Sequence, residues 1–524
     1  MPESSCSDLP ICNGLGHRRL TPFNLLRCGT LPKSFKSALL LLIALSILPA
    51  GGFSSELPAS ISQALRRGGI PASAAGVYIH EVGAGKPLIA VNADNAMNPA
   101  SVMKLLTTFA GLELLGPAYV WKTELYADGI VNGDTLQGDL VIKGYGDPKL
   151  NLENFWLLIR RLRQTGLREI TGDLVVDNSY FDLMPGDPAA FDGKPYRVYN
   201  VFPEAVMVNY KTLALRLVPL PASKTVRVII DPASDLLDLT NNLKLTGEKC
   251  NGWRDALGAD IRADFTNGSR ASIALNGTYS SDCGEKNLHL SLHDSLSYTL
   301  NLFRQLWIEQ GGIFRGKVRP GKAMKGEFPL EIHQSPPLSE IVRDINKFSN
   351  NIAARQLYLA LGSATGMETQ PESGVIDGTP GDTPASLARS DAIIRQWLAS
   401  RNLHFPELVI ENGSGLSRNE RISPRHMGEL LLKAFHSPIM PEFISSLPIT
   451  GTDGTMKKRL EGTAAARQAH IKTGLLEEAR TMAGYVLDKA GRRVVVVFFV
   501  NHPKSGNAQP AMDTLLQWIY ERPK

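Results

Sequence analysis

The sequence predicts an α+β protein with a β-rich region inserted in its middle, and three observations support this. Two strand-like segments, 75–82 and 87–91, precede an apolar stretch with helical spacing, 99–115. From 119 to 290 the chain changes to short strands separated by turns of Gly, Asp and Asn. Helical spacing then returns, and the chain ends with three further strands and a helix.

The individual elements follow from periodicity and from turn residues. A short helix is predicted over 61–67, and the helix over 99–115 has Pro99 in its first turn and ends before Gly116-Pro117. Downstream, the pattern predicts helices over 297–310, 338–361, 386–401 and 508–520, strands over 470–473, 481–488 and 492–501, and a surface loop over 365–383.

The composition is that of a globular chain able to bury a large core. Of the 524 residues, 43% are hydrophobic and 20% are charged, and this length allows two or three domains. The net charge is +5, of which three positive charges come from the first 53 residues. Phosphate binding needs clustered Lys and Arg, and the sequence has no such stripe interleaved with aromatic residues. We therefore expect no nucleic-acid partner.

The first 53 residues are typical of an export signal. Lys33 and Lys36 precede a short apolar run, 38–48, and small residues follow it. We interpret 1–53 as a signal peptide with a long n-region, and an uncleaved membrane anchor is the alternative. Only two cysteines follow, and two cysteines in an exported chain suggest a disulfide, with two unpaired buried thiols as the alternative. They are Cys250 and Cys283.

Three short motifs bear on function. In the first, Ser101 and Lys104 are three residues apart on a predicted helix, which puts the hydroxyl and the ammonium group on one face. A Ser hydroxyl needs a base to become a nucleophile, and a desolvated Lys near other cations can serve as that base. About two S-x-x-K matches are expected by chance at this length, so the first motif is weak alone.

The other two motifs lie later in the chain. Ser349-Asn350-Asn351 offers a hydroxyl that can relay a proton and an amide that can hold an acyl chain, with a polar bend or helix cap as the alternative. Lys472-Thr473-Gly474 puts a cation and a hydroxyl side by side on a strand, which suits a substrate carboxylate. Gly474 lets a ligand backbone approach closely, although a strand ending in a turn has the same pattern.

Together, in the order S-x-x-K, S-x-N and K-T-G, these motifs form a specific signature. The sequence resembles the penicillin-binding protein and serine β-lactamase superfamily. Ser101 and Ser349 are 248 residues apart. The excess length falls in the β-rich region, which resembles the class C penicillin-binding proteins, the D-alanyl-D-alanine carboxypeptidase/endopeptidases. Further segments that share this likeness are 138–148, 202–205, 411–417 and 451–455.

The resemblance implies a split β-lactamase/transpeptidase-like domain, 54–118 and 291–524. Its five-stranded antiparallel sheet has helices on both faces and takes strands from both parts. The β-rich insert, 119–290, is then one or two small domains beside the active site. The implied substrates are peptidoglycan peptides ending in D-Ala-D-Ala, the implied covalent inhibitors are β-lactams, and the implied location is the periplasm. No metal or organic cofactor is implied.

The resemblance also implies catalytic roles for four side chains. Ser101 attacks the carbonyl of the penultimate D-Ala, and Lys104 is the base. Ser349 together with Lys472 passes a proton to the departing group.

Substrate contacts are implied for further residues of the same motifs. Lys472, Thr473 and Gly474 bind the terminal carboxylate end, and Asn351 holds the acyl chain. The backbone N–H groups of Ser101 and Leu475 form the oxyanion hole.

A few residues have weaker signals. Asp177 matches a family region that contacts the amino end of a diaminopimelate side chain, with a turn residue as the alternative. His80 and His470 lie in no H-E-x-x-H or G-x-S-x-G frame, so we interpret them as structural.

Two other functions share the three motifs. A β-lactamase needs an efficient deacylating arrangement, but no E-x-x-L-N segment lies between the second and third motifs, and the insert is large. A non-catalytic periplasmic cell-wall binding protein would keep the fold, but the intact motifs argue against it.

Overall fold

The computed structural model describes residues 56–265, 268, 270–324, 326, 328–363 and 384–523. The predicted signal peptide 1–53 and the predicted loop 365–383 lie outside the described residues. Within the described residues, no helix combines the length and the apolar character needed to cross a bilayer.

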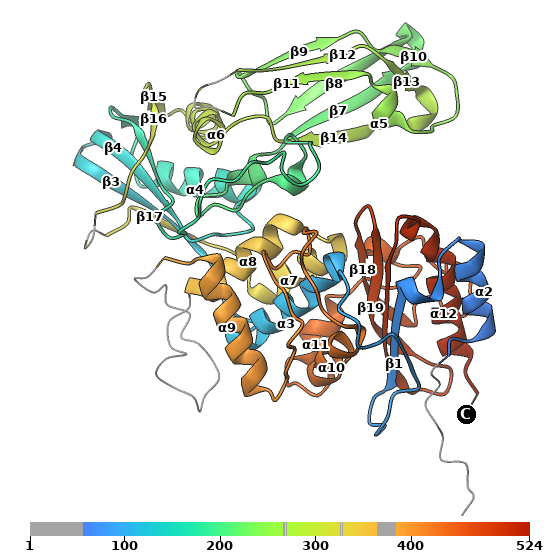
Figure 1. Cartoon of the computed structure of the whole chain (residues 1–524). Coiled ribbons are helices and arrows are strands. Elements are labelled where there is room, and N and C mark those ends of the chain that lie inside the picture. Colours follow the sequence, from blue (N-terminus) through green and yellow to red (C-terminus); the bar gives the residue numbers. More distant parts are fainter. Residues whose placement is uncertain are drawn as a thin grey trace, which may run out of the picture. The chain divides into compact units, whose positions relative to one another are not determined.

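A five-stranded antiparallel sheet takes its strands from both ends of the described chain (Figure 1). Its order is β18-β19-β20-β1-β2. The strands are β1 (Ala75–Glu81), β2 (Ile89–Val91), β18 (Ala469–Leu475), β19 (Ala479–Leu487) and β20 (Arg493–Asn501). This arrangement confirms the predicted α+β fold. We call the part built on this sheet, 56–118 and 338–523, the sheet domain.

Helices cover both faces of this sheet, and β20 shows why its sequence is apolar throughout. Its even-numbered residues from 494 to 500 share a core with α2 (Ala59–Arg67) and α12 (Gln509–Glu521). Its odd-numbered residues from 495 to 499 pack into the core of α3 (Lys104–Leu114) and α10 (Pro424–Phe435). A strand buried on both faces shows a continuous apolar run instead of alternation. The remaining helices of this domain are α7 (Leu338–Phe348), α8 (Asn351–Ser363), α9 (Leu387–Ser400) and α11 (Met440–Ser445).

Two predicted helices depart from a regular α-helix, and each departure lies at or next to a serine of a motif. The stretch predicted as helical over 338–361 is two helices, because Ser349 adopts a left-handed conformation with φ of 57° and ends α7. The Asn350 side chain then caps the start of α8. The helix predicted over 99–115 begins as a 3-10 turn, η3 (Ala100–Met103), before α3, and the φ of 46° at Ala100 marks this change.

The inserted region holds two groups of strands beside three helices. The helices are α4 (Leu152–Gln164), α5 (Trp253–Ala256) and α6 (Ser295–Glu309). One group forms a seven-stranded sheet from β3 (Lys122–Asn132), β4 (Thr135–Gly144), β5 (Glu169–Ile170), β6 (Leu174–Asp177), β15 (Ile313–Phe314), β16 (Val318–Pro320) and β17 (Glu331–Gln334). The other group contains β7 (Leu213–Leu220), β8 (Thr225–Asp231), β9 (Leu237–Asn241), β10 (Lys244–Thr246), β11 (Ala259–Arg262), β12 (Ala271–Leu275), β13 (Thr278–Ser280) and β14 (Lys286–Leu290). In this second group a disulfide joins Cys250 to Cys283.

The domain boundary predicted between residues 290 and 291 is wrong. Helix α6 packs into the core of the insert, and β15, β16 and β17 pair with β5, β6 and β3. Residues 291–337 therefore belong with the insert, and the second part of the sheet domain begins at α7. Periodicity reveals an amphipathic helix such as α6 but not the core against which it packs.

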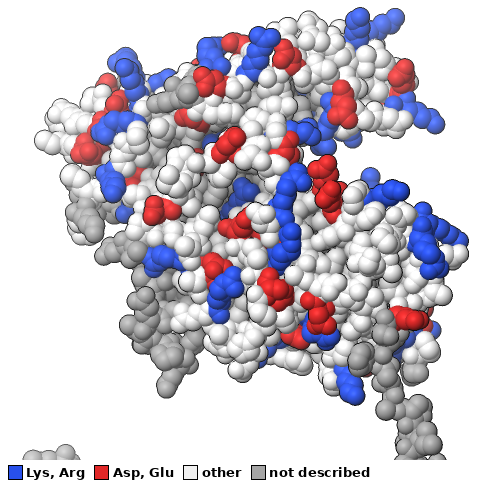
Figure 2. Space-filling view, viewed as in Figure 1, with Lys and Arg blue, Asp and Glu red and all other residues white. Residues whose placement is uncertain are grey.

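Charged side chains of both signs are mixed on one face of the molecule. Figure 2 shows acidic and basic residues interspersed on the visible face, without a stripe of one sign.

Candidate active site

Close contacts between backbones position Ser101 in the η3 turn. The preceding Ala100 is fully buried and has the positive φ noted above. A Cβ atom on Gly415 would lie 1.9 Å from the Ala100 carbonyl oxygen, and one on Gly474 would lie 2.9 Å from the Ala100 Cβ atom. Two distant segments therefore approach the turn so closely that only glycine fits.

Lys104 has contacts that suit a base. It is fully buried, and its Nζ lies 2.9 Å from Ser101 Oγ and 2.7 Å from Asn351 Oδ1. Nζ also contacts the carbonyl oxygen of Ser414. Because amide and carbonyl oxygens only accept hydrogen bonds, a neutral Lys104 would donate its two N–H groups to Asn351 and Ser414. Its lone pair would then point at the Ser101 hydroxyl.

The surroundings favour this neutral form. Burial lowers the pKa of the Lys104 ammonium group well below its ordinary value, and the positive charge of Lys472 lowers it further. The buried carboxyl group of Glu420 acts in the opposite direction. Burial raises the pKa of Glu420 to about 7, although one of its oxygens accepts hydrogen bonds from the backbone N–H groups of Glu411 and Asn412.

Lys472 and Ser349 form a second pair from distant parts of the chain. Lys472 Nζ donates to Ser349 Oγ at 3.0 Å and to the Thr473 carbonyl oxygen at 2.7 Å. Lys472 is fully buried, and burial lowers its pKa to about 7. The Thr473 hydroxyl lies at the surface and donates to Thr455 Oγ1 at 2.8 Å. This pair offers a hydroxyl with a cation behind it.

The structure thus gathers the three motifs in one place. The two lysines are close enough for the charge of Lys472 to affect Lys104. Strand β18 ends at Leu475, and its Gly474 lies against the η3 turn. The backbone N–H groups predicted for the oxyanion hole, those of Ser101 and Leu475, therefore belong to segments in contact.

Asp177 serves a turn in this structure. It is 2% exposed, and its two oxygens accept hydrogen bonds from the backbone N–H groups of Ser179 and Ala323, each at 2.9 Å. These contacts are those of the turn alternative, and since each carboxylate oxygen can accept a further hydrogen bond, the substrate contact stays a prediction. His80 and His470 each place Nδ1 against a backbone carbonyl oxygen, as structural residues do.

Sequence reasoning missed Ser414, Glu420 and Arg355. Ser414 lies in a segment that resembled the family, but nothing in the sequence indicated that its carbonyl oxygen would accept from Lys104. The charges of Glu420, which lies in a loop, and of Arg355, which lies in α8, act on the pKa of Lys104, and neither residue belongs to a sequence motif. The glycine on each side of Ser414 was the one available signal of a close approach.

Comparison with known proteins agrees with this geometry. The D-Ala-D-Ala carboxypeptidase 3 (S13) family model matches residues 57–519. A D-alanyl-D-alanine carboxypeptidase of an Actinomadura species is 26% identical over 478 residues, which cover 88% of this chain and 84% of the relative. The D-alanyl-D-alanine carboxypeptidase DacB of Haemophilus influenzae is 22% identical over 424 residues, which cover 80% of this chain and 83% of the relative.

Solved structures show the same fold. The crystal structure of penicillin-binding protein 4 from Haemophilus influenzae matches with a TM-score of 0.71 at 21% identity, and the match covers 89% of this chain and 100% of that one. Because the family model spans both parts of the sheet domain and the insert, this chain belongs to the D-Ala-D-Ala carboxypeptidase 3 (S13) family.

Proposed function

We propose that this D-Ala-D-Ala carboxypeptidase works through an acyl-enzyme on Ser101. The contacts of Lys104 carry the proposal, because Asn351 and Ser414 take its donors and leave the lone pair for Ser101 Oγ. Lys104 accepts the hydroxyl proton while Ser101 bonds to the carbonyl carbon of the penultimate D-Ala. The backbone N–H groups of Ser101 and Leu475 hold the negative oxygen, and each such donor contributes about 3 kcal/mol.

The second lysine assists the departure of the leaving group. When the bond to the terminal D-Ala breaks, its nitrogen receives a proton through Ser349, which Lys472 contacts. Lys472 and Thr473 also bind the terminal carboxylate, and Gly474 leaves room for the peptide. Water then hydrolyses the ester and releases the shortened peptide. Cleavage of D-Ala to diaminopimelate cross-links uses the same acylation step and is included in the proposal.

Peptidoglycan stem peptides ending in D-Ala-D-Ala are the substrates in this proposal, and β-lactams are the covalent inhibitors. The Haemophilus influenzae penicillin-binding protein 4, whose fold this chain shares, has been solved in complex with a β-lactam. We place the enzyme in the periplasm, because 1–53 has the pattern of an export signal and the substrate lies outside the cytoplasm.

Intact-protein mass spectrometry after incubation with benzylpenicillin tests the proposal, with peptide mapping of any adduct. We expect a slowly released adduct on Ser101 in the wild type and none in Ser101→Ala, which removes one hydroxyl from the edge of the core. Rapid destruction of the drug without a lasting adduct would instead indicate a β-lactamase. An unmodified protein with the drug unconsumed would indicate a non-catalytic cell-wall binding protein.

A further inference from the structure

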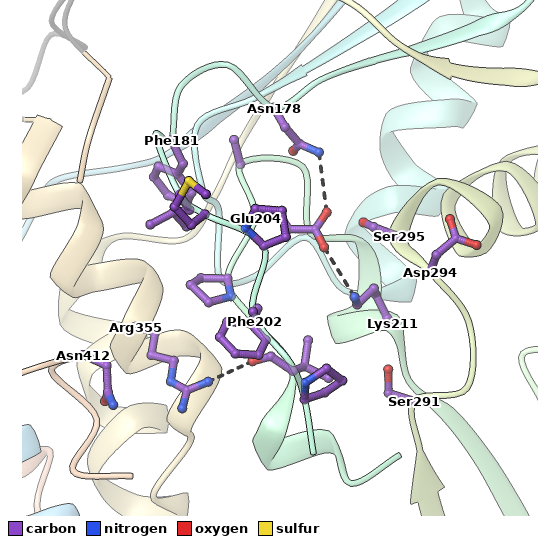
Figure 3. A pocket seen from close by; sticks show the side chains of 18 of the residues that line it. Asn178, Phe181, Phe202, Glu204, Lys211, Ser291, Asp294, Ser295, Arg355 and Asn412 are labelled. Atoms are coloured by element: carbon purple, nitrogen blue, oxygen red, sulfur yellow. Dashed lines mark hydrogen bonds and ion pairs between the residues drawn. The ribbon is translucent and has the colours of Figure 1, made fainter. Parts of the chain in front are cut away.

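Adjoining cavities lead away from the strand that carries the third motif. Leu476, directly after β18, lines a cavity together with Arg418. Arg418 also lines a neighbouring cavity of about 390 Å³. That cavity shares Phe202 and Arg355 with a larger one of about 1020 Å³, which lies between the insert and the sheet domain (Figure 3). We call these three cavities, each of which shares lining residues with the next, the path of cavities; it begins beside Leu476, one residue after β18.

Arg355 lies where the two larger cavities meet. It is 9% exposed, its Nη1 donates to the Val201 carbonyl oxygen at 3.1 Å, and its guanidinium carbon lies 5.9 Å from the centre of the Phe202 ring (Figure 3). Its Nε has no hydrogen-bond partner. Among the described residues, no carboxylate lies within ion-pair distance of it. A buried cation is costly unless an anion pairs with it, so this side chain is prepared for a ligand.

Four acids of the described chain line the larger cavity, and none of them forms an ion pair with Arg355; they are Asp182, Glu204, Asp294 and Glu411. Glu204 is 3.3 Å from Lys211 Nζ and accepts a hydrogen bond from Asn178 at 3.5 Å (Figure 3). Lys211 and Glu204 therefore neutralise each other. Burial lowers the pKa of Arg355 to about 10, so its guanidinium group keeps its charge at neutral pH. Among the described residues, Arg355 is then a buried cation without an ion pair, whereas Arg418, which lines the two smaller cavities, contacts Glu477 at 3.3 Å.

The position of Arg355 on α8 determines how far its guanidinium group lies from the Ser101 hydroxyl. It follows Asn351 by one helical turn on the same face, so their Cβ atoms are about 6 Å apart. Asn351 contacts Lys104, which contacts Ser101. The guanidinium group therefore lies on the order of 10 to 15 Å from the attacking hydroxyl.

A peptidoglycan stem peptide carries a carboxylate at a matching distance. Its γ-linked D-glutamate lies two residues before the D-Ala that is acylated, and its α-carboxylate takes no part in the peptide chain. Extended residues span about 3.5 Å each and the γ-linkage lengthens the chain, so this carboxylate lies on the order of 10 Å from the reacting carbonyl carbon. Guanidinium groups bind carboxylates with paired hydrogen bonds.

We propose that Arg355 is a specificity residue that binds the free carboxylate of the D-glutamate in the stem peptide. This inference rests on the proposed function. In the bound complex the stem peptide runs along the path of cavities, and the carboxylate meets the guanidinium group above the Phe202 ring. Amidation of the glutamate removes the negative charge and with it this contact.

The test measures kcat/KM for two peptides ending in D-Ala-D-Ala that differ only in a free or an amidated D-glutamate. We expect the wild type to prefer the free carboxylate about tenfold, as one charge-assisted contact provides. In Arg355→Met the ratio should fall to about one, whereas Arg355→Lys should retain part of it. A change in kcat/KM that is the same for both peptides cancels in the ratio of the two values. Lys211→Met is the matched control, because it removes a paired cation from the same cavity and should leave the preference in place.

The outcomes separate this inference from the proposed function. A wild type that hydrolyses both peptides equally well overturns the role of Arg355, and this comparison needs no variant to fold. A preference that survives in Arg355→Met also overturns it, because a group other than Arg355 must then contact the glutamate carboxylate. A wild type that fails to hydrolyse even a short acylated D-Ala-D-Ala peptide contradicts the proposed function itself.

Discussion

The two buried lysines of the active site have the same side chain but different surroundings. Around Lys104, two acceptors take the N–H groups that a neutral amine has, and the charges of Lys472 and Glu420 act on its pKa in opposite directions. Lys472 donates to a hydroxyl and to a carbonyl oxygen, and burial alone accounts for its lowered pKa. Both lysines are buried, so burial does not distinguish them. Their hydrogen-bond partners do, because the acceptors around a neutral Lys104 leave its lone pair for the Ser101 hydroxyl.

Replacing each lysine by methionine tests this difference most strongly. Lys104→Met removes the proposed base while keeping an apolar stem, so we expect acylation by benzylpenicillin to slow about 10³-fold. Lys472→Met leaves the base in place and should slow the same step less, while weakening the contact with the substrate carboxylate. Rates of adduct formation measured by mass spectrometry compare the two variants. Equal losses would contradict the assignment of separate roles.

The pH dependence of stability sharpens the comparison. Folding lowers the pKa of Lys472 from 10.5 to about 7. Between these two values the unfolded chain holds a proton that the folded chain has released, so this group makes the free energy of unfolding rise with pH. The wild type should therefore gain stability relative to Lys472→Met between about pH 7 and pH 10, as urea unfolding would show. A difference that is constant with pH would contradict a burial-driven shift.

The smallest expected effect concerns the acid beside Lys104. Glu420→Gln keeps an oxygen for the backbone N–H groups of Glu411 and Asn412 but removes the charge that raises the pKa of Lys104. The acidic limb of the kcat/KM profile should move to lower pH by less than about one unit. The shift is small because Glu420, with a pKa of about 7, is itself partly protonated in this range. A shift to higher pH would exclude this influence.

Much of the fold followed from local patterns. The apolar runs of β1, β19 and β20 and the periodicity of α3 and α12 predicted elements that the structure contains. The boundary after residue 290 was wrong because the short strands β15 to β17 are defined by their partners in the insert, which a local pattern does not reveal. The break at Ala100 was missed because that residue lies in otherwise helical periodicity, whereas a bend or helix cap at Ser349 was the alternative interpretation of the second motif.

The residues of the candidate site were likewise predicted from local sequence, whereas their contacts are seen only in the structure. Ser101, Lys104, Ser349 and Lys472 were predicted because a known signature relates short motifs to one chemistry, and the structure places their side chains in two contacting pairs. The substrate contact of Asp177 stays a prediction, and only the structure shows that its oxygens accept hydrogen bonds from the backbone N–H groups of Ser179 and Ala323.

The sequence by itself determined the α+β class, the family likeness and the side chains worth testing, because these depend on apolar periodicity and on motifs of a few residues. The tertiary structure alone decided where the lone pair of a neutral Lys104 would point, how closely Gly415 approaches Ala100, and that Arg355 is buried with no described carboxylate within ion-pair distance, although the charge of Glu420 raises its pKa. Each of these depends on contacts between segments far apart in the chain, and hydrogen bonding and burial are set only when those segments meet.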